Sequence, residues 1–226
     1  MTMDVYWISG SPYAWAVLLT LELKKLDYTS RLLVESQGEL KTPEFLALNP
    51  HGQVPVMRDG DVVLPESLAI LAYIERKAPD PPMLGRSAEE TGRIWKFMLD
   101  CHNNLISPVD RLVGPALESQ HYGSVEENAD DMREAAKIVK RELGYLEAAL
   151  TDRDWLVGSE LTAADMVIFP FILIFERAIS HKSVAPLDLG LGPVSEKFPA
   201  IGAWKERIAA LDGYEKTYPP HWREAA

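Results

Sequence analysis

The stretch 49–67 constrains the fold more than any other part of the chain, because it holds several local signals in a fixed order. Two short runs of strand-forming residues, 54–57 and 62–64, flank Asp59-Gly60. An Asp-Gly dipeptide between two such runs is the strongest short-range signal of a two-residue hairpin turn. Glu66-Ser67 then begins a segment with apolar residues at helical spacing. The stretch therefore predicts a β-hairpin that leads directly into a helix.

The residues before this hairpin predict two more strands and two helices. The Val, Tyr, Trp and Ile residues of 4–8 and the weak alternation of 28–34 are typical of strands. Between them, Ser11-Pro12 predicts a helix start with Ser11 as the N-cap, and a short helix is expected at 43–48. The order is then β-α-β-α-β-β-α over about 78 residues. It predicts a compact α/β domain with helices on both faces of its sheet.

A proline-rich linker divides the chain. Three prolines within four positions of 78–85 cannot continue a helix and favour an extended path. Beyond the linker the composition is helical, most clearly in 89–117 and 127–150. We therefore expect a first domain over 1–78, a linker over 79–87 and an all-helical bundle domain over 88–226.

Two features of the second half are interpreted as structural. Thr162 and Asp165 have the spacing of a capping box, in which the threonine caps the aspartate amide and the carboxylate reaches back to the cap amide. Leu161 and Met166 occupy the positions of a hydrophobic staple around it. The tail 213–226 is expected to be irregular.

The charge balance excludes several classes of partner. The 226 residues include 23 basic and 34 acidic side chains, which gives a net charge of −11. An acidic surface repels nucleic acid and anionic lipid, so neither is expected as a partner. The most apolar run, 166–175, falls well short of the roughly 20 residues of a membrane helix. The N-terminus has no signal-peptide pattern, so a cytoplasmic protein is expected.

Cysteine and histidine usage gives no sign of a metal site. The single cysteine, Cys101, excludes an intrachain disulfide and a cysteine-based zinc site, and it fits a reducing compartment. Four scattered histidines show no metal-ligand spacing; they are His51, His121, His181 and His221. No metal cofactor is expected.

Four motifs together resemble one protein family. They are Ser11-Pro-Tyr13, the Asn-Pro-His-Gly-Gln-Val-Pro run at 49–55, Glu66-Ser-Leu-Ala-Ile70 and Leu161-Thr-Ala-Ala-Asp165. In order and spacing they resemble the cytosolic glutathione S-transferases over residues 1 to about 215. The resemblance implies a thioredoxin-like N-terminal domain, an all-helical C-terminal domain, glutathione as co-substrate and a homodimer. A serine beside the first helix resembles the theta, zeta and tau types, and the class is not fixed.

The resemblance assigns the catalytic role to Ser11. A free thiol has a pKa of about 8.5, and only its thiolate is strongly nucleophilic. A hydroxyl at a helix N-terminus stabilises a thiolate through a hydrogen bond and the helix dipole, so Ser11 would donate to the glutathione sulfur. Considered without the resemblance, Ser-Pro is also an ordinary cap pair. Tyr6, near the end of the first strand, and Ser9 are alternative donors.

The resemblance also implies a surface that binds the glutathione backbone. It implies that the Val54-Pro55 bond is cis and that Val54 pairs with the cysteinyl backbone of glutathione. A cis X-Pro bond turns the NH and C=O of the preceding residue outward, where they can pair with an extended peptide. An edge-strand proline with a trans bond is the alternative. Gln53 and Lys41 are candidates for the glycine end of glutathione, Lys41 by its charge.

Glu66 and Ser67 are expected to bind the γ-glutamyl end. The Ser67 amide at a helix N-terminus can hold a carboxylate. The Glu66 carboxylate can pair with an ammonium group. Alternatively, both residues simply begin the helix.

The second substrate is expected between the domains, against the first half of the helix after the linker. Met98, His102 and Ile106 have the spacing of one helix face, which for Met98 and Ile106 equally predicts a buried stripe, and Tyr13 can supply an aromatic wall. The predicted activity is attack of glutathione thiolate on a small electrophile, as in detoxification. The alternatives are a glutathione-dependent isomerase or reductive lyase (dehalogenase) of the same fold, and a non-catalytic interaction protein with a glutathione-transferase-like fold.

Overall fold

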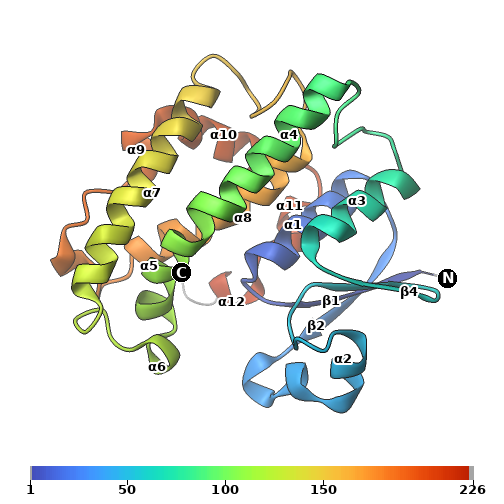
Figure 1. The fold of residues 1–226 in the computed structure, drawn as a ribbon, viewed down its shortest axis with the longest axis horizontal. Helices are drawn as coiled ribbons and strands as arrows, with labels where there is room; N and C mark the ends of the chain where they lie inside the picture. Colours follow the sequence, from blue (N-terminus) through green and yellow to red (C-terminus); the bar gives the residue numbers. More distant parts are fainter. Residues whose placement is uncertain (1, 224–226) are drawn as a thin grey trace. The chain divides into compact units, whose positions relative to one another are not determined.

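A computed structural model describes residues 2–223 of the chain. These residues form two compact units. The first unit comprises residues up to Leu84 together with residues from Ala210 onward, and the second, the helical unit, comprises Gly85–Ala209. Figure 1 shows the elements of both units. Residues 2–223 contain no helix that is both long and apolar enough to cross a membrane.

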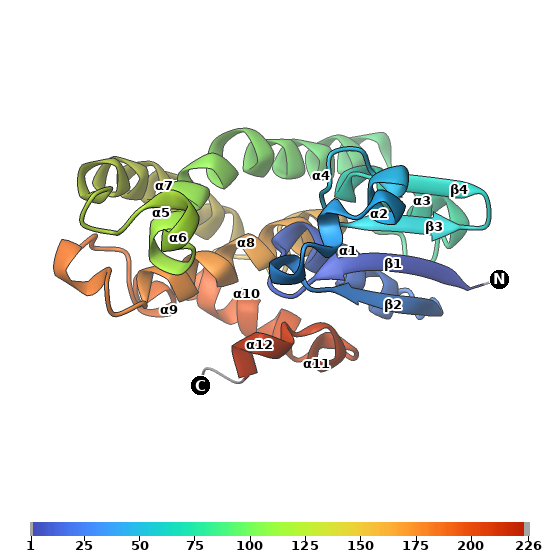
Figure 2. The same cartoon turned by 90° about the horizontal axis from the view of Figure 1, so that it is seen from below.

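The first unit is built on a four-stranded mixed sheet. Its strands are β1 (Met3–Ile8), β2 (Tyr28–Leu33), β3 (Val56–Asp59) and β4 (Val62–Pro65), in the order β2-β1-β3-β4. β1 runs parallel to β2 and antiparallel to β3, and β3 pairs with β4 in the predicted hairpin. Figure 2 shows the four strands in this order. The predicted strand and helix order of this half is confirmed.

Helices cover both faces of the sheet, and the alternation along β1 shows why. Val5 and Trp7 lie in one hydrophobic cluster, which includes residues of α1 (Pro12–Leu23) and α3 (Ser67–Lys77). Tyr6 and Ile8 pack instead against a smaller cluster that contains Phe45 of α2 (Pro43–Leu48). Successive strand residues point to opposite faces of a sheet, so the apolar residues of β1 serve both layers. Between β2 and α2 lie two single 3₁₀ turns, Glu35–Gln37 and Glu39–Lys41.

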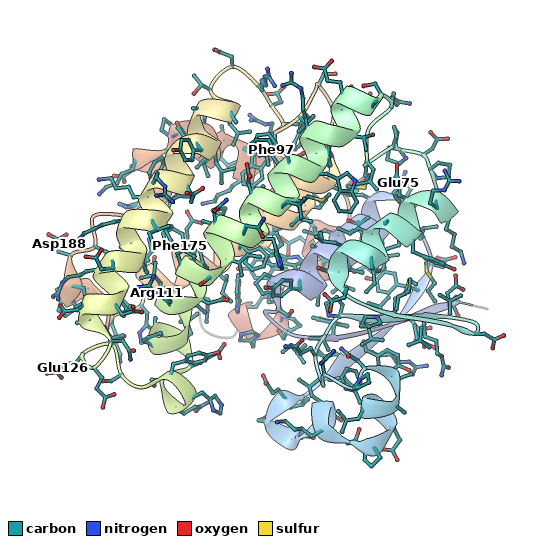
Figure 3. All side chains as sticks on the ribbon, viewed as in Figure 1. Glu75, Phe97, Arg111, Glu126, Phe175 and Asp188 are labelled. Atoms are coloured by element: carbon teal, nitrogen blue, oxygen red, sulfur yellow. The ribbon has the colours of Figure 1, made fainter. Side chains whose placement is uncertain are left out.

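A buried lysine fastens the end of α1 to the start of the linker. The Lys24 side chain is 0% exposed, and its Nζ lies 2.8 Å from Glu75 Oε2. Glu75 projects from α3, as Figure 3 shows. The same Nζ donates to the carbonyl oxygens of Ala78 at 2.6 Å and Pro81 at 2.7 Å. Because a buried charge must be paired and hydrogen-bonded, these contacts hold α1, α3 and the linker together.

The helical unit is largely α-helical, as predicted, and one predicted helix is interrupted. The segment expected as one helix over 89–117 contains a π-helical turn at Cys101–Leu105, between α4 (Ala88–Asp100) and α5 (Ile106–Leu117). A π turn inserts one extra residue, which simple helical spacing does not reveal. α5 packs against α7 and α8, and α10 packs against α7. The remaining elements are α6 (Ser119–Tyr122), α7 (Ala129–Leu150), α8 (Ala163–Ile179), a 3₁₀ turn at Ala185–Leu187, α9 (Val194–Lys197) and α10 (Pro199–Ala209).

The capping box predicted at α8 is confirmed, and its aspartate does more than cap. Asp165 is 0% exposed and accepts hydrogen bonds from the Thr162 amide at 2.9 Å and from the Thr162 hydroxyl at 2.9 Å. It also accepts from the Leu156 amide at 3.0 Å and from Trp204 Nε1 at 2.9 Å. Asp165 therefore joins the start of α8 to the preceding loop and to α10, which supports its interpretation as structural.

The C-terminal segment differs from the sequence-based expectation. Residues 210–223 belong to the first unit rather than to the helical domain predicted over 88–226, and they include the short helices α11 (Tyr214–Thr217) and α12 (Pro220–Arg223). The physical reason is an aromatic cluster. Trp15 of α1 packs edge-on against Trp222 at a centroid distance of 5.6 Å and donates from Nε1 to Thr217 Oγ1 at 3.0 Å. Residues 210–223 are therefore an ordered part of the first unit.

Candidate functional site

Strand register brings three sequence motifs to one end of the sheet. Tyr6 pairs with Val56, and Val56 pairs with Pro65. The residues after Tyr6 on β1 therefore run beside those before Val56, which are Val54 and Pro55. The residues that follow Pro65 begin at the same end of the sheet. The loop that carries Ser11, the Val54-Pro55 pair and the Glu66-Ser67 pair are thus neighbours by topology.

Ser11 is the N-cap of α1, as predicted. Its backbone is extended, its Oγ accepts a hydrogen bond from the Ala14 amide at 3.3 Å, and Pro12 occupies the first helical turn. The hydroxyl has one proton of its own, and no hydrogen bond that donates this proton is present among residues 2–223. That proton is therefore available to a ligand. It stands at the N-terminus of a 12-residue helix, where a negative charge is favoured.

The loop before Ser11 requires a glycine. Gly10 has φ +87°, a conformation that residues with a Cβ rarely adopt. A Cβ at this position would also lie 2.8 Å from His221 Cε1, which belongs to α12. The Ser11 amide donates to the Ile8 carbonyl at 3.3 Å and closes the turn. The tight turn between β1 and α1 thus brings Ser11 to the end of the sheet.

The Val54-Pro55 bond is cis, as the family resemblance implies. The β3 ladder begins at Val56, so Val54 lies just outside the paired part of the strand. The segment before it is held by Asn49, which is 4% exposed. Its Nδ2 donates to the Gln53 carbonyl at 2.8 Å, and its Oδ1 accepts from the His51 amide at 3.1 Å. This role of Asn49 was not predicted from the sequence, where its only signal is that an asparagine opens the motif 49–55.

Glu66 has an unusual backbone at the start of α3. Its φ is +72° and its ψ is +111°, and its side chain makes no cap hydrogen bond to the helix. A non-glycine residue in such a region costs on the order of 1–3 kcal/mol, and residues of this kind cluster at functional sites. The side chain is exposed, whereas Ser67 beside it is 9% exposed. Glu66 therefore begins the helix, as expected, while its side chain makes no hydrogen bond to the helix start, and its role toward a ligand stays a prediction.

The two alternatives to Ser11 have other partners. The Tyr6 ring lies on the α2 face of the sheet, 6.2 Å from the Phe45 ring by their centroids. The Ser9 Oγ lies 2.6 Å from His221 Nδ1, so its hydroxyl is already engaged within the first unit. The only sequence-based prediction for His221 was that it does not bind a metal. No local sequence signal indicates its contact with Ser9.

The remaining predicted binding residues are less constrained. Lys41 ends the 3₁₀ turn Glu39–Lys41 with an exposed side chain, and the Gln53 side chain is also exposed. Tyr13 is half-buried in the first turn of α1. Their roles toward a ligand stay predictions.

The predicted substrate residues of the helical unit divide by exposure. Met98 and Ile106 are only 1% and 6% exposed, which favours the buried stripe that helical spacing equally predicts. His102 is exposed on the π turn. A cavity of about 570 Å³ does lie in this unit, and Phe97, Cys101, Leu105 and Leu146 are among its lining residues. It contains none of the predicted glutathione ligands, and burial raises the pKa of the Cys101 thiol, which makes that thiol unreactive.

Residues 2–223 contain no group of three or more His, Cys, Asp or Glu side chains placed to hold a metal ion. The chemistry that the site offers is thus a hydroxyl donor at a helix N-terminus, beside a strand edge and a second helix N-terminus. Such a set suits an anionic nucleophile on an extended peptide with a free carboxylate.

Two family models match the chain. The model described as "Glutathione S-transferase, N-terminal domain" matches residues 10–77, and the model described as "Glutathione S-transferase, C-terminal domain" matches residues 105–212. The first model includes the predicted glutathione-site residues from Ser11 to Ser67, whereas Tyr6, Ser9, Met98, His102 and His221 lie outside both models. The family models and the two-unit architecture therefore agree.

Individual relatives include proteins named glutathione S-transferase and one named elongation factor 1-gamma 2. Glutathione S-transferase 1 of Dianthus caryophyllus is 33% identical over 173 residues, which cover 76% of each chain. Elongation factor 1-gamma 2 of Oryza sativa subsp. japonica is 34% identical over 160 residues, which cover 71% of this chain and 37% of that protein. The crystal structure of a glutathione S-transferase from the Antarctic clam Laternula elliptica has a TM-score of 0.82 and 31% identity, and the match covers 99% of this chain and 95% of that one.

Proposed function

Because this chain belongs to the glutathione S-transferase family, we propose that it is a glutathione transferase that activates glutathione as a thiolate and adds it to a small electrophile. The observation that carries the proposal is the available Ser11 hydroxyl proton at the N-terminus of α1, at the sheet end shared with Val54 and Ser67. Glutathione supplies the sulfur, and the protein supplies the groups that hold and ionise it.

Ser11 acts on the thiol through its hydroxyl. With a pKa of about 8.5, a free thiol is only about 3% ionised at neutral pH. A hydrogen bond to a charged group contributes about 1.5–3 kcal/mol, and one pKa unit corresponds to about 1.4 kcal/mol. A donated hydrogen bond from Ser11 therefore lowers the thiol pKa by about one to two units. The Ala14 amide, which donates to Ser11 Oγ, polarises the hydroxyl and strengthens that bond.

The other ligand groups orient the tripeptide. We assign the cysteinyl backbone to the NH and C=O of Val54, beside the cis bond to Pro55. The γ-glutamyl carboxylate goes to the amide of Ser67, and the γ-glutamyl ammonium to the Glu66 carboxylate. Gln53 and Lys41 are proposed for the glycine carboxylate. The Glu66 side chain supports this arrangement, because it is exposed and makes no cap hydrogen bond to α3.

The chemical step is a nucleophilic attack. The thiolate forms a carbon–sulfur bond with the electrophilic carbon, and the leaving group departs with its electron pair. Tyr13, two residues after Ser11, is the proposed aromatic contact for the electrophile. Holding both reactants together adds to the advantage of the larger thiolate fraction. A glutathione-dependent isomerase or reductive dehalogenase would use the same activated thiolate on another substrate.

We further propose that the protein acts as a homodimer in the cytoplasm. Exposed apolar side chains on the helical unit, Leu99 and Tyr145, are 44% and 64% exposed and support an association surface. A single buried thiol suits a reducing compartment.

The similarity to elongation factor 1-gamma 2 favours one candidate of another class, a protein that keeps the fold for binding a partner. Two measurements distinguish the transferase from the isomerase, the dehalogenase and the interaction protein. We expect the purified protein to be retained on immobilised glutathione and to conjugate glutathione to a chlorodinitrobenzene well above the solvent rate. Retention without turnover would favour the isomerase, dehalogenase or interaction-protein reading. The absence of both retention and turnover would leave the interaction protein alone.

A further inference from the structure

We propose that His221, from the C-terminal segment, is a positioning residue that holds the loop carrying the Ser11 hydroxyl. The proposal rests on the proposed role of Ser11 and extends it to a segment that the sequence-based prediction assigned to the helical domain over 88–226. The juxtaposition that carries it is a pair of contacts from one imidazole to the two residues before Ser11. One contact is a hydrogen bond, and the other is a close approach to the backbone.

The hydrogen bond joins His221 to Ser9. Ser9 Oγ and His221 Nδ1 are 2.6 Å apart, although 212 residues separate them in sequence. A hydroxyl has one proton, and a neutral imidazole whose Nδ1 accepts uses it, so Ser9 is then no donor to a bound thiol. His221 therefore orients the Ser9 hydroxyl, and in the tautomer whose Nδ1 accepts, Ser11 is the hydroxyl of this loop whose proton stays available.

The close approach joins His221 to Gly10. A Cβ on Gly10 would lie 2.8 Å from His221 Cε1 and 3.4 Å from Trp222 Nε1. The imidazole therefore lies directly on the backbone of the turn that leads into Ser11. Apart from the Ser11 amide bond to Ile8 at 3.3 Å, this turn has few backbone contacts of its own. The side chains of α12 thus restrict the turn from outside.

His221 is itself held in place by its neighbours. Trp222 is 7% exposed and packs edge-on against Trp15 and Tyr218. Arg223 Nη2 donates to the Glu215 carbonyl at 2.5 Å and to Glu215 Oε2 at 2.8 Å. Trp15 lies in the first turns of α1, whose N-cap is Ser11. The segment therefore packs on the helix that it helps to orient.

The contacts of His221 with Ser9 and Gly10 differ from core packing, because the side chain that makes them is exposed. The His221 side chain is exposed, so its removal takes away little buried apolar area. What it removes is one polar contact and one steric stop beside Ser11. An asparagine places its amide near the position of Nδ1, whereas a glutamine amide reaches farther, toward the position of Nε2. His221→Asn thus keeps the contact with Ser9, while His221→Ala and His221→Gln lose it.

The test is a titration of glutathione bound to the full-length protein, followed by the ultraviolet absorbance of the thiolate. We expect His221→Ala and His221→Gln to raise the pKa of the bound thiol by about half a unit, a threefold change in its ionisation constant. His221→Asn should restore the wild-type value. The thermal unfolding midpoint should be the same in all three variants, because the side chain is exposed.

A matched histidine provides the control. In the helical unit, His181 Nδ1 lies 2.7 Å from Ser183 Oγ, so His181→Ala removes the same kind of pair elsewhere. It should leave the titration unchanged. If Ser11→Ala raises the pKa of the bound thiol but His221→Ala does not, this proposal alone is overturned. Equal rises of that pKa in His221→Ala and His221→Asn would overturn it as well. A thiol that is unaffected by Ser11→Ala would overturn the role of Ser11, and the positioning role of His221 with it.

Discussion

Two residues at the end of the sheet where glutathione is proposed to bind have properties that the fold does not need. Ser11 caps α1 with its lone pair and keeps its proton. Glu66 holds a backbone conformation that glycine adopts freely and other residues rarely do. Local sequence patterns show neither property, because a cap serine and a helix-starting glutamate are common for purely structural reasons. The family resemblance, rather than the periodicity of apolar residues, identified these positions.

Glu66→Gly should separate stability from binding at this site. Glycine relieves the strain of the φ of +72°, so we expect a gain of about 1 kcal/mol in the free energy of unfolding. The loss of the carboxylate should weaken glutathione binding about tenfold, which is about 1.4 kcal/mol. Glu66→Gln should weaken binding by a similar factor without the gain in stability. Urea unfolding and titration calorimetry measure the two effects.

Asp188→Gly is the control for Glu66→Gly, because Asp188 also has a positive φ, of 44°, but lies in the helical unit. It should stabilise the protein with no change in glutathione affinity. Equal glutathione affinity in Glu66→Gly and the wild type would remove Glu66 from the binding site.

At the scale of elements, the first unit depends on contacts that tie helix ends together. Lys24 joins the last turn of α1 to Glu75 of α3 and to two carbonyls of the linker. Glu75 in turn accepts from the amides of Met83 and Leu84 at 3.1 Å and 3.3 Å. The proline-rich composition predicts that the chain leaves α3 at this point. It gives no information about which side chain holds the linker, because the partner lies more than 50 residues earlier in sequence.

Lys24→Met should destabilise the protein by about 3 kcal/mol. The methionine keeps the apolar stem but removes the ammonium, so the two carbonyls and part of the Glu75 carboxylate lose their buried partner. Lys25→Met, at the exposed neighbouring position, should change the free energy of unfolding by less than about 0.5 kcal/mol. Chemical denaturation of both variants checks this, and equal stabilities would show that the buried contacts of Lys24 are not needed.

At the scale of the whole molecule, the sequence predicted both architectures but assigned the C-terminal segment to the wrong unit. The segment carries turn signals and no long periodic run, so on local grounds it was expected to be irregular. Its place depends on tertiary packing of Trp15 with Tyr214, Tyr218 and Trp222. One available signal was α1 itself, in which all residues of 14–21 are buried. A helix that is apolar on every side must be covered on every side, which implies a covering segment beyond the sheet.

The central claim concerns the ionisation of one thiol, and the most direct test is its pKa when glutathione is bound. We expect the wild-type protein to lower this pKa by about one to two units below the free value of about 8.5, and Ser11→Ala to abolish most of the shift. Ser36→Ala, in the exposed 3₁₀ turn Glu35–Gln37, should behave as wild type. A bound-thiol pKa that is the same in Ser11→Ala and wild type would contradict the account and leave Ser9 or Tyr6 as the donor.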